Sequence, residues 1–235
     1  MSTSPQKQEA IESFRDWLSQ TGDMTDQILA GILQASMTEA PDGRFFQLHA
    51  PLQLLSKALE FNTHQISQNK DVVELYIAQS SLSDLPEELR GDLATPELVL
   101  KAGKGDVYSS SIWLGTEPTY TPLHRDPNPN LFCQLHGEKV VRLLPPTQGE
   151  ILFFEVQVRI DRNANSRIRT TEMMEGTERE VLHDAVWKLE EAPDQMCEVA
   201  LEPGDALFIP QGWWHSVKSV AAMGGLNASV NWWFR

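Results

Sequence analysis

Residues 121–146 read TPLHRDPNPNLFCQLHGEKVVRLLPP, and the prediction of the fold starts from this stretch. Its short apolar runs alternate with turn formers: a Pro-Asn-Pro-Asn segment, the single glycine at position 137, and then two prolines. Short strands separated by such turns are typical of antiparallel sandwiches and barrels.

The same rhythm continues on both sides of this stretch, from about residue 107 to residue 235. The further apolar runs are VYSSSIWLG, ILFFEVQVRI (151–160), CEVALEPG, DALFIP, HSVKSV and NASVNWWF. We predict that each of these runs is a strand. Residues 161–195 are the exception, because they are polar and contain REVLHDAVWKLEE, which has a helical pattern. We predict that they form an insertion between two strands.

The N-terminal residues have helical periodicity instead. Two segments, each within the first 40 residues, repeat apolar side chains at intervals of three and four: Ile11, Phe14, Trp17 and Leu18, then Ile28, Leu29, Ile32 and Leu33. We predict a third helix over 51–61 and a strand over DVVELYIAQ (71–79). The sequence therefore predicts a mainly β protein, with an N-terminal helical extension (1–70) packed on a β domain (71–235).

Composition and charge narrow the function classes. The chain has 235 residues and a formal net charge of −14, which argues against binding of a nucleic-acid backbone and favours basic peptide partners. No apolar run reaches the length needed to span a bilayer, and the N-terminus lacks the pattern of a signal peptide. The chain also has only two cysteines, so we expect no disulfide framework. Together these features predict an intracellular protein of the cytoplasm or nucleus.

A histidine and an aspartate, His124 and Asp126, stand two residues apart at the start of the opening stretch. Residues at this spacing on a strand face the same side, so both can point into a barrel. Two imidazoles and one carboxylate form the facial triad of non-haem iron sites, and His215 in PGDALFIPQGWWHSV is the candidate for the missing imidazole. Each residue alone would be read as a turn or packing residue, but the three together favour a metal site.

The other histidines have neither a carboxylate nor a histidine at ligand spacing on a strand. We predict that none of them is a metal ligand: His49, His64, His136 and His183.

Three blocks, TPLHRDPNPNLFCQLHGEKVVRLLPP, PGDALFIPQGWWHSV and GGLNASVNWWF, resemble the cupin-type JmjC oxygenases. The likeness is to small JmjC hydroxylases, such as the asparaginyl hydroxylase that acts on hypoxia-inducible factor. It covers about residues 71–79 and 108–235, without the insertion. It implies a double-stranded β-helix (jelly roll) and Fe(II) held by His124, Asp126 and His215, with 2-oxoglutarate as the cosubstrate.

The resemblance also assigns residues to the cosubstrate. Lys139 matches the cation that binds its far carboxylate, and Thr121 matches a hydroxyl that bonds the same group. The other matching positions are Tyr76, Asn130, Phe132, Val217, Asn231 and Trp233. Two positions depart from the hydroxylase pattern: Ala78 replaces a glutamine near the substrate groove, and Trp113 replaces a smaller aliphatic residue.

These similarities imply a dioxygenase that hydroxylates a protein side chain and releases succinate and CO₂. Lysine demethylation uses the same metal site and is the main alternative. Hydroxylation of an RNA base is less compatible with the acidic charge, and a non-catalytic cupin-type binding protein is the alternative outside the enzymes. The hydroxylase's C-terminal dimer helices have no counterpart in the sequence, so we expect a monomer or a dimer that does not use them.

Overall fold

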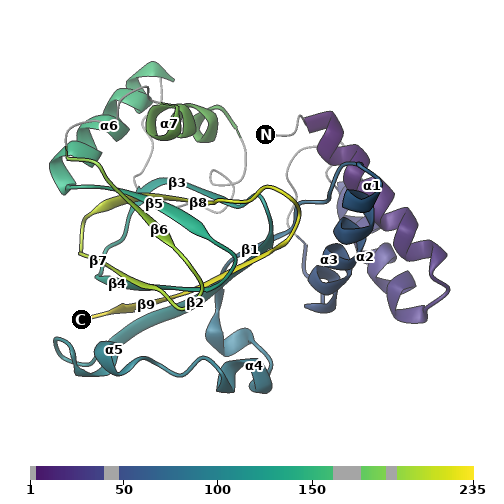
Figure 1. Cartoon of the computed structure of the whole chain (residues 1–235), viewed down its shortest axis with the longest axis horizontal. Coiled ribbons are helices and arrows are strands. Elements are labelled where there is room, and N and C mark those ends of the chain that lie inside the picture. The colour runs from purple at the N-terminus through teal and green to yellow at the C-terminus, as the bar shows by residue number, and fades with distance from the viewer. Residues whose placement is uncertain (1–3, 40–47, 161–175, 189–194) are drawn as a thin grey trace. The chain divides into compact units, whose positions relative to one another are not determined.

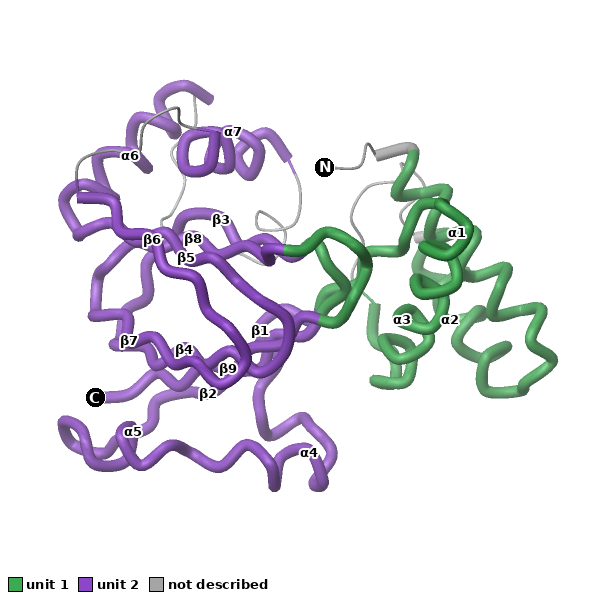
Figure 2. The backbone as a smooth tube through the Cα atoms, viewed as in Figure 1, with its two compact units in different colours: residues 1–76, 115–118, 221–226 green, residues 77–114, 119–220, 227–235 purple. Residues whose placement is uncertain are grey.

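The computed structural model describes residues 4–39, 48–160, 176–188 and 195–235. The chain forms two compact units (Figure 2), one of residues 1–76, 115–118 and 221–226, and one of residues 77–114, 119–220 and 227–235. Within the described residues, no helix is both long and apolar enough to cross a membrane.

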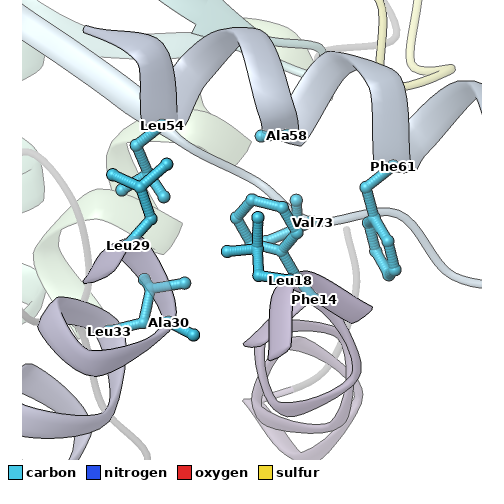
Figure 3. Close-up of a cluster of buried hydrophobic side chains, with 9 residues drawn as sticks. All are labelled: Phe14, Leu18, Leu29, Ala30, Leu33, Leu54, Ala58, Phe61 and Val73. Carbon is cyan, nitrogen blue, oxygen red and sulfur yellow. The ribbon is translucent and has the colours of Figure 1, made fainter. Parts of the chain in front are cut away.

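The first unit contains three helices: α1 (Ser4–Gln20), α2 (Met24–Glu39) and α3 (Gln53–Ser67). Their apolar faces meet in one core, as the helical periodicity predicts (Figure 3). The buried residues of this core are Phe14, Leu18, Leu29, Ala30, Leu33, Leu54, Ala58, Phe61 and Val73. The three predicted helices are confirmed, and the third extends six residues beyond its predicted end at 61.

The strand predicted over 71–79 is wrong in its first half, because β1 (Tyr76–Ser81) begins only at Tyr76. The buried amide of Asn62 takes the place of a strand partner there. Its Oδ1 accepts from the N–H of Val73 at 2.8 Å, and its Nδ2 donates to the Val73 carbonyl at 3.0 Å. Val73 itself packs into the helical core. The apolar character of residues 71–75 therefore reflects packing against helices and not pairing in a β-ladder.

The nine strands of the described chain form two antiparallel sheets (Figure 1). The five-stranded sheet has the order β1-β2-β9-β4-β7, and the four-stranded sheet has the order β3-β8-β5-β6. The remaining strands are β2 (Val107–Thr116), β3 (Tyr120–Arg125), β4 (Asn130–His136), β5 (Lys139–Leu144), β6 (Cys197–Leu201), β7 (Ala206–Ile209), β8 (Trp214–Ser219) and β9 (Leu226–Phe234). Apolar side chains of the two sheets meet in one interior cluster: Phe132, Val141, Leu143, Leu201, Ile209 and Val217. The predicted mainly β jelly roll with N-terminal helices is confirmed.

The two faces of strand β9 differ in polarity. Val230, Trp232 and Phe234 pack outward against Val99 of α5 (Glu97–Lys101), in the segment that also contains α4 (Glu87–Gly91). The alternate residues are mostly polar although they are buried: Asn227, Ser229, Asn231 and Trp233. Because side chains alternate along a strand, these polar groups face the interior between the sheets.

Two helices cover the outer face of the four-stranded sheet, α6 (Pro146–Arg159) and α7 (Thr177–Trp187) (Figure 1). The strand predicted over 151–160 is therefore wrong. Phe153 and Val156, three residues apart, pack with Trp214 and Leu182 on one face, which is helical spacing. Pro146 at the first turn also favours a helix start. The helix predicted within the insertion is confirmed as α7, while 161–175 and 189–194 lie outside the described residues.

The contact between α6 and β8 leaves no room for a side chain at Gly149. A Cβ atom there would lie 2.2 Å from Cγ of Trp214, the residue that precedes His215. We expect Gly149→Ala to lower the free energy of unfolding by about 1–3 kcal/mol, the usual cost of overpacking, as measured by chemical unfolding. Gly31→Ala is the control, since nothing lies within 4 Å of its Cβ in helix α2. That change should stabilise by roughly 0.5–1 kcal/mol. Equal effects of the two substitutions would contradict the packing.

Candidate metal centre

The three predicted ligands come together on the inner side of the four-stranded sheet. His124 lies on β3, Asp126 follows the end of that strand, and His215 lies on β8. One ligand atom from each lies within 4.8 Å of the others, and this is the one such group among the described residues. Asp126 Oδ1 is 4.0 Å from Nε2 of His124, and its Oδ2 is 3.6 Å from Nε2 of His215. The other histidines of the described chain stay outside the group.

A bulge in the β3–β8 ladder makes this approach possible. Thr121 pairs with Val217, but His124 pairs with His215, so the register shifts by one residue between the two pairs. Residues three apart on a regular strand face opposite sides, so His124 would otherwise point away from Thr121 and Val217. The extra residue restores His124 to the inner face. The two imidazole rings consequently lie with their centroids 4.0 Å apart.

Backbone carbonyls orient both imidazoles. Nδ1 of His124 lies 2.8 Å from the Pro122 carbonyl, and Nδ1 of His215 lies 3.3 Å from the Trp213 carbonyl. A carbonyl only accepts, so Nδ1 carries a proton in each ring, and Nε2 is the nitrogen that faces Asp126. Such a bond to the distal nitrogen is the usual support of a metal-binding histidine.

Asp126 is oriented by a chain of two amides. Asn130 Nδ2 donates to Asp126 Oδ2 at 2.8 Å, and Asn231 Nδ2 donates to Asn130 Oδ1 at 2.8 Å. The Trp233 side chain also donates to the carboxylate. These residues come from β4 and β9, so the sheet opposite β3 and β8 sets the rotation of the carboxylate.

Charge and burial shift the pKa values of His124 and Asp126 toward the protonation states that bind a cation. Burial, together with the nearby His215, lowers the pKa of His124 from 6.5 to about 3, so its imidazole is neutral near pH 7. Burial by itself would raise the pKa of Asp126. The two histidines and the hydrogen bonds from Trp233 and Asn130 outweigh it and hold that pKa below the ordinary value of 3.8. Neutral imidazoles and an ionised carboxylate are the protonation states that metal binding requires.

The depressed pKa of His124 predicts how the stability of the metal-free protein depends on pH. Below about pH 6.5 the unfolded chain binds a proton that folded His124 does not bind until about pH 3. The free energy of unfolding should therefore fall as the pH falls through this window, by up to about 1.4 kcal/mol per pH unit. Urea unfolding in the presence of a chelator measures this slope. His124→Gln should flatten the curve, and parallel curves for the two proteins would contradict the prediction.

Lys139 lies in the same interior. Its side chain is 2 % exposed, and its Nζ donates to Ser229 Oγ of the opposite sheet at 2.6 Å. It also lies 5.4 Å from the ring centroid of Phe132. A buried ammonium forms strong, charge-assisted hydrogen bonds with a carboxylate, so the position suits the carboxylate of a ligand. The structure thus brings together most of the predicted cosubstrate residues in this interior.

The remaining predicted positions divide into two groups. Thr121 and Val217 form a directly opposed, buried pair on β3 and β8, and so face the same interior as the imidazoles. Tyr76 is half-buried at the start of β1 and belongs to the first unit, so its place in the pocket stays a prediction. Arg125 turns outward, as alternation predicts, with its guanidinium 5.3 Å from the Trp214 ring.

Sequence reasoning missed two parts of this site. Ser229, which binds Lys139, is one of the buried polar residues of β9; their alternation in NASVNWW was a visible signal of a polar interior. The bulge had a weaker signal, namely that Thr121 and His124 were both assigned inward although they are three residues apart.

The residues present fit Fe(II) and 2-oxoglutarate. Two imidazole nitrogens and one carboxylate, gathered within 4.8 Å of one another, are the donor set of a facial triad. A buried cation for a carboxylate lies in the same interior. Asn231 Oδ1 is buried and accepts no hydrogen bond from the described residues, so a bound molecule or water would satisfy it.

Comparison with known proteins agrees with this geometry. The chain is 32% identical over 167 residues to lysine-specific demethylase JMJ30 of Arabidopsis thaliana, covering 68% of this chain and 33% of that protein. It is 31% identical over 156 residues to JmjC domain-containing protein D of Dictyostelium discoideum, covering 62% and 32%. It is 27% identical over 193 residues to lysine-specific demethylase 8 of Xenopus tropicalis, covering 77% and 38%.

The chain thus spans about a third of the length of the curated relatives that it matches. The resemblance to JmjC proteins is confirmed by these relatives. A family model described as the cupin-like domain matches residues 6–235, which is nearly the whole chain, so this protein belongs to the cupin-like domain family.

Proposed function

We propose that the protein is an Fe(II)- and 2-oxoglutarate-dependent dioxygenase that hydroxylates a protein side chain. The observation that carries the proposal is the enclosure, within one barrel interior, of the His124–Asp126–His215 group and the buried cation of Lys139. A metal group alone would suit many reactions. A metal group that shares its interior with a buried ammonium suits a cosubstrate with an acid at each end.

When bound, iron(II) would activate dioxygen as the oxidant and 2-oxoglutarate would be the co-reductant: one oxygen atom would enter succinate as CO₂ is released, and the other would be inserted into a C–H bond of the substrate. The side chains of the protein bind and orient these groups. His124, Asp126 and His215 hold the metal, and Lys139 with Thr121 holds the far carboxylate. Phe132, Val217 and Trp233 form walls that exclude water from the interior, since all three side chains are buried.

Demethylation of an N-methylated lysine is the second candidate, favoured by the names of two relatives, which are lysine-specific demethylases. Both reactions would use the same three ligands, so the metal group does not separate them. The net charge of −14 favours a basic peptide in either case. The oligomeric state expected from the sequence, a monomer or a dimer without C-terminal helices, remains part of this proposal.

The test is incubation of the iron-loaded protein with 2-oxoglutarate and libraries of basic peptides, some of them carrying methylated lysines. Succinate measured by NMR reports turnover, and mass spectrometry reports the product. The gain of one oxygen by a peptide supports hydroxylation, whereas loss of a methyl group with release of formaldehyde supports demethylation. A protein that binds neither metal nor 2-oxoglutarate in a thermal-shift assay is instead a non-catalytic cupin-type binding protein.

A further inference from the structure

The bulge between Thr121 and His124 leaves a gap in the β3–β8 ladder. Pro122 occupies the bulge, and a proline has no N–H to donate to the neighbouring strand. The residue of β8 that lies between the pairs of the shifted register is Ser216, directly after the ligand His215. The ladder is therefore interrupted next to His124 and His215, at the point that sets the distance between the two imidazoles.

The Ser216 side chain fills this gap. It is fully buried, and its Oγ donates to the Thr121 carbonyl at 2.9 Å, across the interrupted part of the ladder. The same Oγ accepts a hydrogen bond from Nε1 of Trp187 at 3.0 Å. We call this chain, from Trp187 through Ser216 to Thr121, the Ser216 bridge. It connects the last residue of α7 to both strands that carry imidazoles.

The Trp187 end of the bridge is itself held in place. The Arg142 guanidinium lies 4.6 Å and the Lys218 ammonium 4.3 Å from the Trp187 ring centroid. Arg142 also donates to the Val186 carbonyl at the end of α7 and forms a salt bridge with Glu198 at 2.6 Å. Cations over an indole face are attracted by its quadrupole, so β5 and β8 both fix the ring from which the bridge starts.

We propose that Ser216 and Trp187 are positioning residues for the metal centre, through which α7 sets the separation of His124 and His215. This inference rests on the proposed metal site. The hydroxyl of Ser216 acts on the metal only through the bulge: it keeps Thr121 at the distance that turns His124 inward. Helix α7, although it packs on the outer face of the sheet, thereby becomes part of the support of the inner face.

The test compares metal binding by wild type, Ser216→Ala, Trp187→Phe and the double variant. Mn(II) affinity is measured by calorimetry, and the absorption spectrum of the Co(II)-loaded protein reports ligand geometry. We expect Ser216→Ala to bind Mn(II) about 10-fold more weakly, as for loss of other outer-sphere partners, with an altered Co(II) spectrum. Trp187→Phe keeps an aromatic ring, although a smaller one, and removes the Nε1 donor, so we expect a smaller loss in the same direction.

Two comparisons separate positioning from general destabilisation. Ser219→Ala is the matched control, because Ser219 is a buried serine of the same strand whose Oγ accepts from the N–H of Thr119 at 2.9 Å, away from the ligands. It should bind Mn(II) as wild type does. The double variant should bind no more weakly than Ser216→Ala alone, because Trp187 acts through Ser216. Circular dichroism verifies that each variant is folded.

The results distinguish the two proposals. If wild type binds Mn(II) and Ser216→Ala binds it equally well, the bridge has no positioning role, while the metal site stands. Equal losses in Ser216→Ala and Ser219→Ala would likewise overturn the bridge alone. If wild type itself binds neither Mn(II) nor Co(II), the proposed metal centre fails, and the bridge fails with it.

Discussion

A His124→Ala variant is expected to lose metal binding by more than about 100-fold and to show no detectable turnover of 2-oxoglutarate. Loss of an outer-sphere partner alone costs 10- to 100-fold in affinity, and this change removes a ligand atom. No other described histidine or carboxylate can replace it, since the described residues contain one metal-binding group. Calorimetric titration with Mn(II) and NMR detection of succinate measure the two effects.

The matched control for this variant is His136→Ala, which removes an exposed imidazole at the end of β4. It should leave Mn(II) affinity and turnover at the wild-type level. Undiminished metal binding by His124→Ala would remove this residue from the ligand set. Loss of folding is checked by circular dichroism, because the imidazole is buried and bonds the Pro122 carbonyl.

The second large effect is expected at Lys139. Replacing it with methionine keeps the length of the side chain but removes the charge, so the far carboxylate of 2-oxoglutarate loses its cation. Hydrogen bonds to charged groups contribute about 1.5–3 kcal/mol, which corresponds to roughly 10- to 100-fold in affinity. We therefore expect 2-oxoglutarate to bind Lys139→Met weaker by this factor, measured by titration of the Mn(II)-loaded protein.

Mn(II) affinity should stay unchanged in Lys139→Met, because the lysine is not part of the metal-binding group. This separates a cosubstrate effect from damage to the whole site. Lys101→Met provides the control, since the Lys101 side chain is 72% exposed and pairs only locally with Glu97 in the described structure. If Lys139→Met binds 2-oxoglutarate as tightly as wild type, the far carboxylate is bound elsewhere.

Much of the fold could be predicted because its signals are local. Helical periodicity around Phe14 and Leu29 depends only on residues a few positions away, and both helices form. The alternation that points His124 inward and Arg125 outward is equally local. His215 could be placed beside these residues because its motif is specific, although it lies on another strand.

The misjudged elements depend on distant contacts. Residues 151–160 are apolar and partly β-branched, so their pattern fits a strand; they form a helix because Phe153 and Val156 pack on Trp214. Residues 71–75 have strand composition, but the amide of Asn62 binds their backbone. The Ser216 bridge joins residues far apart in the chain, and a single serine between His215 and Val217 has no pattern that reveals it.

The position of the proposed metal ligands on neighbouring strands has a consequence for the folding of this protein. Asp126 and His215 lie 89 residues apart (215 − 126), so an ion that joined them in an unordered chain would close a long loop. In this barrel, however, the backbone pairing of the β3–β8 ladder closes the same loop, so the entropy of closure is not offset by an ion alone. An ion can then add only its own binding free energy, unlike the zinc of a finger domain, which supplies the free energy of folding. A descendant of this chain could therefore lose a ligand and its chemistry and still inherit the fold.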